Sequence, residues 1–313
     1  MPPPSRCTAA TTMNAPTRTP ARVAAIIAAG LAGVVIAILA AFWSTGWRWF
    51  IVESPSMGRT APVGTLVVTS PVSVSAVHVG DVITFHPPTS PDETYTHRVR
   101  DVTPAGTLVT RGDINGATDP WQLSGHDLVG RAAAILPGWG WLIRCLPFLF
   151  VGSLLVWALT GWFATARWRA PLRVIGASLV FAVTAAIVRP FVGVMVLATQ
   201  STHHGANATL VSTGLLPIHV QAIGGTGVGL VSGQVGSVHV PRLAADGYYH
   251  LAATPSFSLV GWIVVGIVCA APLLWCLIVG LPGEEAQADD AKRQEPKREE
   301  PPRREPRVGE ATA

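Results

Sequence analysis

The chain has 313 residues, of which 49% are hydrophobic and only 13% are charged. So low a charged fraction is unusual for a soluble protein and indicates several membrane spans. The formal net charge is +4. Because no basic patch is interleaved with aromatic residues, we expect no nucleic-acid partner. Four cysteines are present without a CxxC pair, so we expect no zinc or iron–sulfur site.

Apolar runs interrupt the chain at four places. They cover residues 23–45, 145–165, 174–198 and 257–281. The first would be about 35 Å long as a helix at ~1.5 Å per residue, which is enough to cross a bilayer. It is longer than the roughly 7–15 apolar residues of a signal peptide and lacks a clear A-x-A site, so we interpret it as an uncleaved anchor. The third contains Arg189-Pro190, and a functional and a structural role for this arginine both stay open.

The segments between and around these runs differ in composition. Residues 46–143 contain short alternating apolar runs separated by turn residues, the pattern of a small all-β domain. Residues 199–256 return to short β-like pieces with many glycines, and their role is open. Residues 1–22 and 282–313 are predicted to be disordered tails, the second rich in Pro and in charges of both signs.

Basic residues orient the predicted spans. They cluster before the first span, between the second and third, and after the fourth: Arg6, Arg18 and Arg22; Arg167, Arg169 and Arg173; Lys292, Arg293, Lys297 and Arg298. The positive-inside rule therefore places both termini in the cytoplasm, and residues 46–143 and 199–256 outside. We predict a multi-pass cell-membrane protein of mixed class, with about four transmembrane helices, a β-rich external domain and a second small β-like external segment.

A candidate nucleophile lies just beyond the first span. Ser56 needs a base, because a serine hydroxyl is otherwise a weak nucleophile. The chain has two lysines, both in the C-terminal tail, so the predicted topology excludes a lysine base. His97 lies on a predicted strand and is followed by Asp113 and Asp119. Serine, histidine and an acid on one segment are the groups that acyl transfer needs.

Six short motifs in order give the segment a family likeness. They are SPSM at 54–57, PVGTLVV at 62–68, VGDVITF at 79–85, THRV at 96–99, TRGDIN at 110–115 with Asp119, and VGRA at 129–132. Over about residues 23–165 the chain resembles type I signal peptidases. The likeness is to the branch of the endoplasmic reticulum, archaea and some Gram-positive bacteria, which uses histidine in place of lysine.

The resemblance implies a β-rich catalytic domain on the outer membrane face that removes signal peptides from exported precursor proteins. It implies Ser56 as nucleophile, His97 as base, Asp119 as triad acid and Asp113 as a second nearby acid. It also implies an oxyanion hole at the Ser56 N–H with the Ser54 hydroxyl, and Met57 in the substrate cleft. No metal or cofactor is called for, and the partners expected are precursor proteins and the lipid bilayer.

Two positions depart from the family pattern. The family usually has Gly between the two serines, where this chain has Pro55, and an acidic residue and Pro where it has Gly58-Arg59. These departures are the basis of an alternative, a catalytically silent relative that acts as a membrane-anchored binding protein. A structural envelope protein is a third reading.

Overall fold

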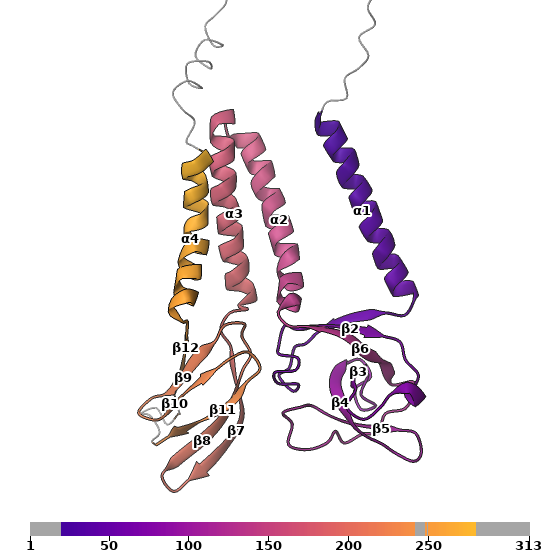
Figure 1. The fold of residues 1–313 in the computed structure, drawn as a ribbon. Coiled ribbons are helices and arrows are strands. Elements are labelled where there is room, and N and C mark those ends of the chain that lie inside the picture. The colour runs from indigo at the N-terminus through magenta and orange to yellow at the C-terminus, as the bar shows by residue number, and fades with distance from the viewer. Residues whose placement is uncertain (1–19, 242–247, 249, 280–313) are drawn as a thin grey trace, which may run out of the picture.

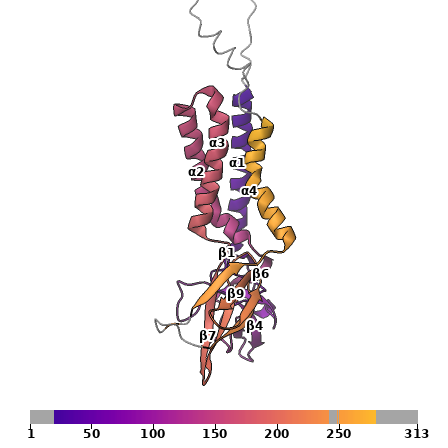
Figure 2. The same ribbon diagram turned by 90° about the vertical axis from the view of Figure 1, so that its left-hand side faces the viewer.

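The computed structural model describes residues 20–241, 248 and 250–279. Two β units lie side by side at one end of the molecule, and the helices extend from them in one direction (Figures 1 and 2). Helix α1 spans Pro20–Ser44, α2 spans Trp139–Phe163, α3 spans Ala166–Val188 and α4 spans Leu259–Val279. Most of the two expected disordered tails lies outside the described residues, and residues 20–22 belong to α1.

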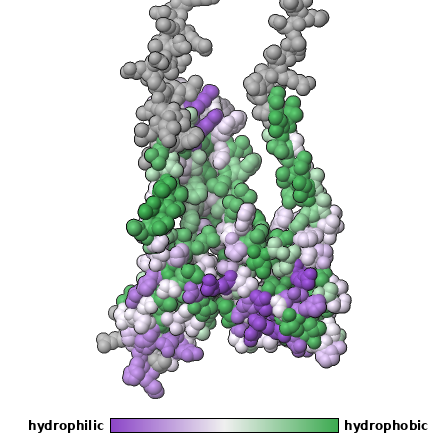
Figure 3. All heavy atoms as spheres, in the orientation of Figure 1, coloured by the Kyte–Doolittle hydropathy of each residue, from purple (hydrophilic) through white to green (hydrophobic). Residues whose placement is uncertain are grey.

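Three of the described helices, α1, α2 and α3, are long and apolar enough to cross a membrane. A shorter apolar stretch, Leu259–Ala271, lies within α4. The spheres in Figure 3 show hydrophobic residues over the helices and hydrophilic ones gathered on the β units. Helices α2 and α3 pack closely where Gly152 faces Val180 and Gly176 faces Val156, a small-residue contact typical of helices in membranes.

The third helix differs most from its predicted bounds. We expected residues 174–198, but α3 ends at Val188 and strand β7, Val194–Thr202, takes the rest. Arg189 is the C-cap residue in a left-handed conformation, with φ 50°, and Pro190 cannot continue the helix. The arginine therefore lies at the end of the span, where a positive charge suits the helix dipole.

The second helix begins earlier than the predicted residue 145. Arg144, expected before the span, is inside the first turns of α2. Its guanidinium pairs with Glu53 of the first β unit and lies 5.6 Å from the Trp141 ring centroid. Because the long Arg144 side chain reaches the polar end of α2, its charge is compatible with a position inside the helix.

The first β unit is one antiparallel sheet in the order β1-β2-β6-β3-β4-β5. Its strands are β1 Arg48–Ile51, β2 Leu66–Ser70, β3 Val82–Phe85, β4 Tyr95–Val102, β5 Leu108–Arg111 and β6 Leu128–Leu136, with a 3-10 turn, η1, at Val74–Ala76. Strands β2 to β5 match the alternating runs predicted from the sequence at 65–69, 81–85, 96–99 and 107–110, whereas β1 and β6 were not predicted as strands. The larger core cluster of this unit includes Ile83, Phe85, Val99 and Leu108, and Ile83 and Phe85 are two positions apart on β3, so they share one face of the strand.

The second β unit is a sandwich of two three-stranded sheets, β10-β9-β12 and β11-β8-β7. Its remaining strands are β8 Gly205–Ser212, β9 Ile218–Ala222, β10 Gly227–Leu230, β11 Val235–Val240 and β12 Leu251–Pro255. Alternate residues such as Leu210, Val220 and Val238 form its core, the arrangement of two facing sheets. The β-like segment expected at 199–256 therefore forms β structure, which begins at Val194.

Candidate active site

A tight turn presents Ser56 at the edge of the first sheet. The Gly58 N–H donates to the Pro55 carbonyl over 2.7 Å, which closes a turn around Ser56 and Met57. Pro55 is the first residue of this turn, so its carbonyl serves as acceptor and its missing N–H is not needed. Pro55 and Gly58, which both depart from the family pattern, are thus the first and last residues of one hydrogen-bonded turn.

Met57 is buried beneath this turn and is not among the residues that line the cleft described below. Its side chain is 1% exposed and packs with Ala61 and Val82. We expected Met57 to line the substrate cleft, and its position corrects that expectation. A long thioether beneath a tight turn fills the core and fixes the turn on the sheet.

Strand β4 brings His97 to the serine. The His97 Nε2 atom lies 3.1 Å from Ser56 Oγ, and His97 Nδ1 lies 2.7 Å from Asp119 Oδ2. The side chains of His97 and Asp119 are each only 7% exposed. Because a carboxylate only accepts hydrogen bonds, Nδ1 carries the proton and Nε2 is left to accept from the serine hydroxyl.

Strand β5 and the loop after it position the acid. The Asp119 N–H donates to the Thr110 carbonyl over 2.9 Å, and the Thr110 hydroxyl donates to Asp119 Oδ2 over 2.6 Å. Thr110 pairs with Val99 of β4, so the strand that carries His97 lies directly beside the residue that holds its acid. Thr110 is a site residue that the sequence reasoning missed.

The loop between β5 and Asp119 also touches the serine. The Ile114 N–H donates to the Ser56 carbonyl over 3.0 Å. A Cβ on Gly112 would lie 2.7 Å from the same carbonyl oxygen and 2.9 Å from the Ser56 Cβ, which is closer than real Cβ contacts allow. Glycine is therefore needed at 112 for this approach.

Asp113 lies in a different network from His97 and Asp119. Its carboxylate accepts from both Arg98 Nε and Arg98 Nη2, at 2.8 and 2.7 Å, and from Arg100 and Thr60, at 3.1 and 2.7 Å. The hydrogen bonds from Arg98 are the main reason why the pKa of Asp113 is below its ordinary value. The second acid that the resemblance implies is thus held by two arginines of β4 and does not contact His97 in this arrangement. Arg98 follows His97 on β4, so its side chain leaves the opposite face of the sheet.

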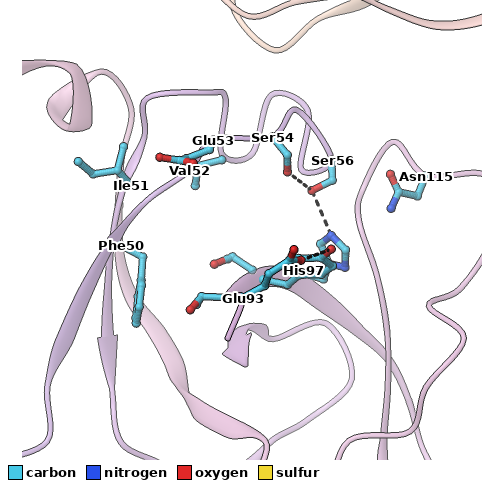
Figure 4. Close-up of a pocket in the computed structure, with 12 residues that line it drawn as sticks. Phe50, Ile51, Val52, Glu53, Ser54, Ser56, Glu93, His97 and Asn115 are labelled. Carbon is cyan, nitrogen blue, oxygen red and sulfur yellow. Dashed lines mark hydrogen bonds between the residues drawn. The ribbon is translucent and has the colours of Figure 1, made fainter. Parts of the chain in front are cut away.

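Ser54 completes the group around the nucleophile. Its Oγ lies 3.2 Å from Ser56 Oγ, as the dashed line in Figure 4 shows. If the Ser56 proton points to His97, the hydrogen bond between the two serines must be donated by Ser54. Ser54 is then a hydroxyl donor next to the nucleophile.

A cleft of 620 Å³ opens in front of Ser56 and His97 (Figure 4). Strand β1 and the residue after it form one wall with Phe50, Ile51 and Val52, and the start of β4 forms the other with Tyr95 and Thr96. Glu53, Glu93 and Asn115 also line it. Strand β1 is too short and too close to the anchor for its alternation to be recognised in the sequence, so these wall residues were missed.

Comparison with known proteins agrees with the motifs. Residues 23–113 match the family model of signal peptidase, peptidase S26. The resemblance to signal peptidases is confirmed. This signal-peptidase match includes Ser56, His97 and Asp113 and ends before Asp119, so it is shorter than the 23–165 we expected. No curated protein matches the chain.

Proposed function

We propose that this protein is a membrane-bound signal peptidase, a serine endopeptidase that cleaves signal peptides from exported precursor proteins. One observation carries the proposal: Ser56, His97 and Asp119 form a continuous hydrogen-bonded chain, with separations of 3.1 and 2.7 Å, at the edge of a cleft. The match of residues 23–113 to the signal peptidase family supports the substrate class.

The first half of the proposed reaction is acylation. His97 Nε2 takes the Ser56 proton as Ser56 Oγ attacks the scissile carbonyl carbon, and Asp119 stabilises the imidazolium that forms. The tetrahedral oxyanion is stabilised by donors aimed at it, which we assign to the Ser56 N–H and the Ser54 hydroxyl. When the tetrahedral intermediate collapses, the C–N bond breaks and His97 gives its proton to the leaving amine.

The second half releases the product. Water loses a proton to His97 Nε2 and attacks the ester carbon of the acyl-enzyme. The Ser56 oxygen leaves and recovers that proton from His97. Each of the proposed proton transfers passes through His97 Nε2, which lies within hydrogen-bond distance of Ser56 Oγ, and no metal or cofactor takes part in the proposed steps.

The cleft walls explain how an extended peptide would be held. Strand β1 is one of the two edge strands of the sheet, and an edge offers unpaired backbone groups to a further strand. The apolar wall of Phe50, Ile51 and Val52 suits the small uncharged residues that precede a signal-peptide cleavage site.

We further propose that both β units are extracytoplasmic and that both termini are cytoplasmic. Both units lie at the same end of the helices (Figure 1), and the described arginines Arg169 and Arg173 lie in α3 near its opposite end. Trp43, Trp49, Trp139 and Trp262 lie where α1, α2 and α4 meet the β units. Tryptophan is enriched at membrane–water interfaces.

The decisive experiment is cleavage of a precursor by the solubilised protein. The full chain in detergent is incubated with a precursor protein that carries an A-x-A cleavage site, and the products are identified by mass spectrometry. We expect one cut after the A-x-A sequence with the native protein and none with Ser56→Ala. If the native protein is folded, with the same Tm as Ser56→Ala, and still cleaves no precursor, the result would favour the silent relative.

A further inference from the structure

Two glycines from different β units are in direct backbone contact. Gly58 ends the nucleophile turn, residues 55–58, and Gly233 lies in the turn between β10 and β11; their φ angles are 53° and 72°. A Cβ on Gly233 would lie 2.7 Å from the Gly58 carbonyl carbon and 3.0 Å from the Arg59 nitrogen. A Cβ on Gly58 would lie 3.5 Å from the Gly233 carbonyl oxygen. No side chain separates the two units here.

The β10–β11 turn is a fixed part of the sandwich. The Gln234 N–H donates to the Val231 carbonyl over 2.9 Å, and the Gly233 N–H donates to the Ser212 carbonyl over 2.8 Å. The Gln234 side chain closes the turn by accepting from the Val231 N–H over 3.2 Å. Ser212 is fully buried at the end of β8 and its N–H donates to the Gln234 carbonyl. The turn is therefore anchored to the core strand β8.

The nucleophile turn is supported on a second side by the β5 loop. A Cβ on Gly58 would lie 2.5 Å from Ile114 Cγ2, so the Ile114 side chain lies against the turn. The Ile114 N–H holds the Ser56 carbonyl. The turn that carries Ser56 is thus in contact with Ile114 of its own unit and with Gly233 of the other.

We propose that the second β unit, β7–β12, positions the catalytic nucleophile, with Gly233 as the positioning residue. The β10–β11 turn holds the backbone of Gly58 and so sets the distance from Ser56 Oγ to His97 Nε2. The unit needs no catalytic group for this task, which gives a role to a segment outside the family match. The catalytic consequence rests on the proposed function, and the placement of the Ser56 side chain can be measured without it.

The test compares two glycines with the same φ angle. Gly224 also has φ 72° and lies in the same β unit, but a Cβ there would have nothing within 4 Å. In the full-length protein, Gly233→Ala and Gly224→Ala therefore impose similar backbone strain, and only the first displaces the nucleophile turn. We expect Gly233→Ala to lower kcat on the order of 10–100-fold, since displacements of about 1 Å have such effects. KM should stay near the native value because the cleft walls are untouched, and Gly224→Ala should match the native protein in both.

A second measurement does not need peptidase activity. In a Ser56→Cys background, the rate of iodoacetamide alkylation at position 56 is followed by mass spectrometry, because thiolate formation depends on the distance to His97. Gly233→Ala should change this rate severalfold and Gly224→Ala should not. Gln234→Ala is the substitute if Gly233→Ala does not fold. It removes the side-chain acceptor of the Val231 N–H without a clash at Gly58, and it should change the alkylation rate in the same direction.

The outcomes separate the two proposals. Equal kcat and equal alkylation rates for Gly233→Ala, Gln234→Ala and Gly224→Ala would overturn the positioning role. A native protein that cleaves no precursor, with alkylation still sensitive to Gly233→Ala, would refute the peptidase function and leave the positioning of residue 56 standing.

Discussion

At the scale of single residues, Asp119 and Asp113 lie six positions apart in the sequence and hold different partners. Asp119 Oδ2 accepts from His97 and Thr110, whereas the Asp113 carboxylate accepts from Arg98, Arg100 and Thr60. The contacts of Asp119 orient the His97 imidazole, and the contacts of Asp113 tie the loop after β5 to β4. The two acids should therefore fail in different ways when they are neutralised.

We predict that Asp119→Asn lowers kcat by about 10³–10⁴-fold while the protein stays folded, because an amide fixes the wrong tautomer of His97. Asp113→Asn should keep more of the activity and lose about 1–3 kcal/mol of stability, since the arginine hydrogen bonds lose a charged acceptor. Measuring kcat and Tm for both variants tests this. A catalytic loss confined to Asp113→Asn would reverse the assignment.

The lowered pKa of Asp113 leads us to predict that the stability of the folded protein depends on pH. Arg98 holds the pKa of Asp113 below the ordinary value of 3.8. A lowered folded-state pKa gives stabilisation that is present above the unfolded value and is lost as pH falls through the folded value. The Tm difference between the native protein and Asp113→Asn should thus be constant from pH 7 to pH 5 and shrink below about pH 4. A difference that persists unchanged at pH 2 would show that the charge of Asp113 is not its source.

At the scale of elements, the start of α2 is joined to the first sheet through one turn. The Trp141 indole N–H donates to the Val63 carbonyl over 3.1 Å. Gly64, with φ 82°, lies so close that an added Cβ would overlap the Trp141 ring. This contact fixes the first sheet at the end of a helix that is long and apolar enough to cross a membrane.

Gly64→Ala should therefore destabilise the protein more than Gly106→Ala. Gly106 has a similar φ of 79°, but nothing lies within 4 Å of its Cβ position, so the control measures backbone strain alone. We expect the additional loss at Gly64 to be about 1–3 kcal/mol, the usual effect of overpacking, and to appear as a lower Tm in detergent. Equal Tm values for the two variants would mean that the turn and the indole do not touch in the folded protein.

The β1 strand shows why some elements escaped prediction. Its four residues, Arg48–Ile51, begin only four positions after the last residue of α1 and are too few to show an alternating pattern. Only pairing with β2 makes them a strand. The end of the third span was predicted too late in the chain for a different reason. The apolar residues of β7 follow Pro190, so the apolar run continues in the sequence although the helix has already ended.

At the scale of the whole molecule, the two β units are expected on the same side of the membrane. Ser75 of the first unit and Ser237 of the second are both exposed, and Thr165 lies in the α2–α3 connection at the opposite end of the helices. In a background that lacks the native cysteines, Ser75→Cys and Ser237→Cys should react with an impermeant thiol reagent in intact cells. Thr165→Cys should react only after lysis. Labelling of Thr165→Cys from outside, or protection of either serine position, would refute the topology.

The sequence by itself predicted the apolar helices, the β character of residues 46–143 and 199–256, and Ser56, His97 and the two acids as candidate site residues. Each of these follows from a local signal: apolar length, period-2 alternation, or a short motif. The family resemblance pointed to Asp119 as the acid beside His97, but only the tertiary structure shows what holds each acid, because the Thr110 hydroxyl comes from β5 and the arginines around Asp113 come from β4. It also placed Gly233 against Gly58, a contact between backbones 175 positions apart that leaves no periodic signal in the side chains of either segment.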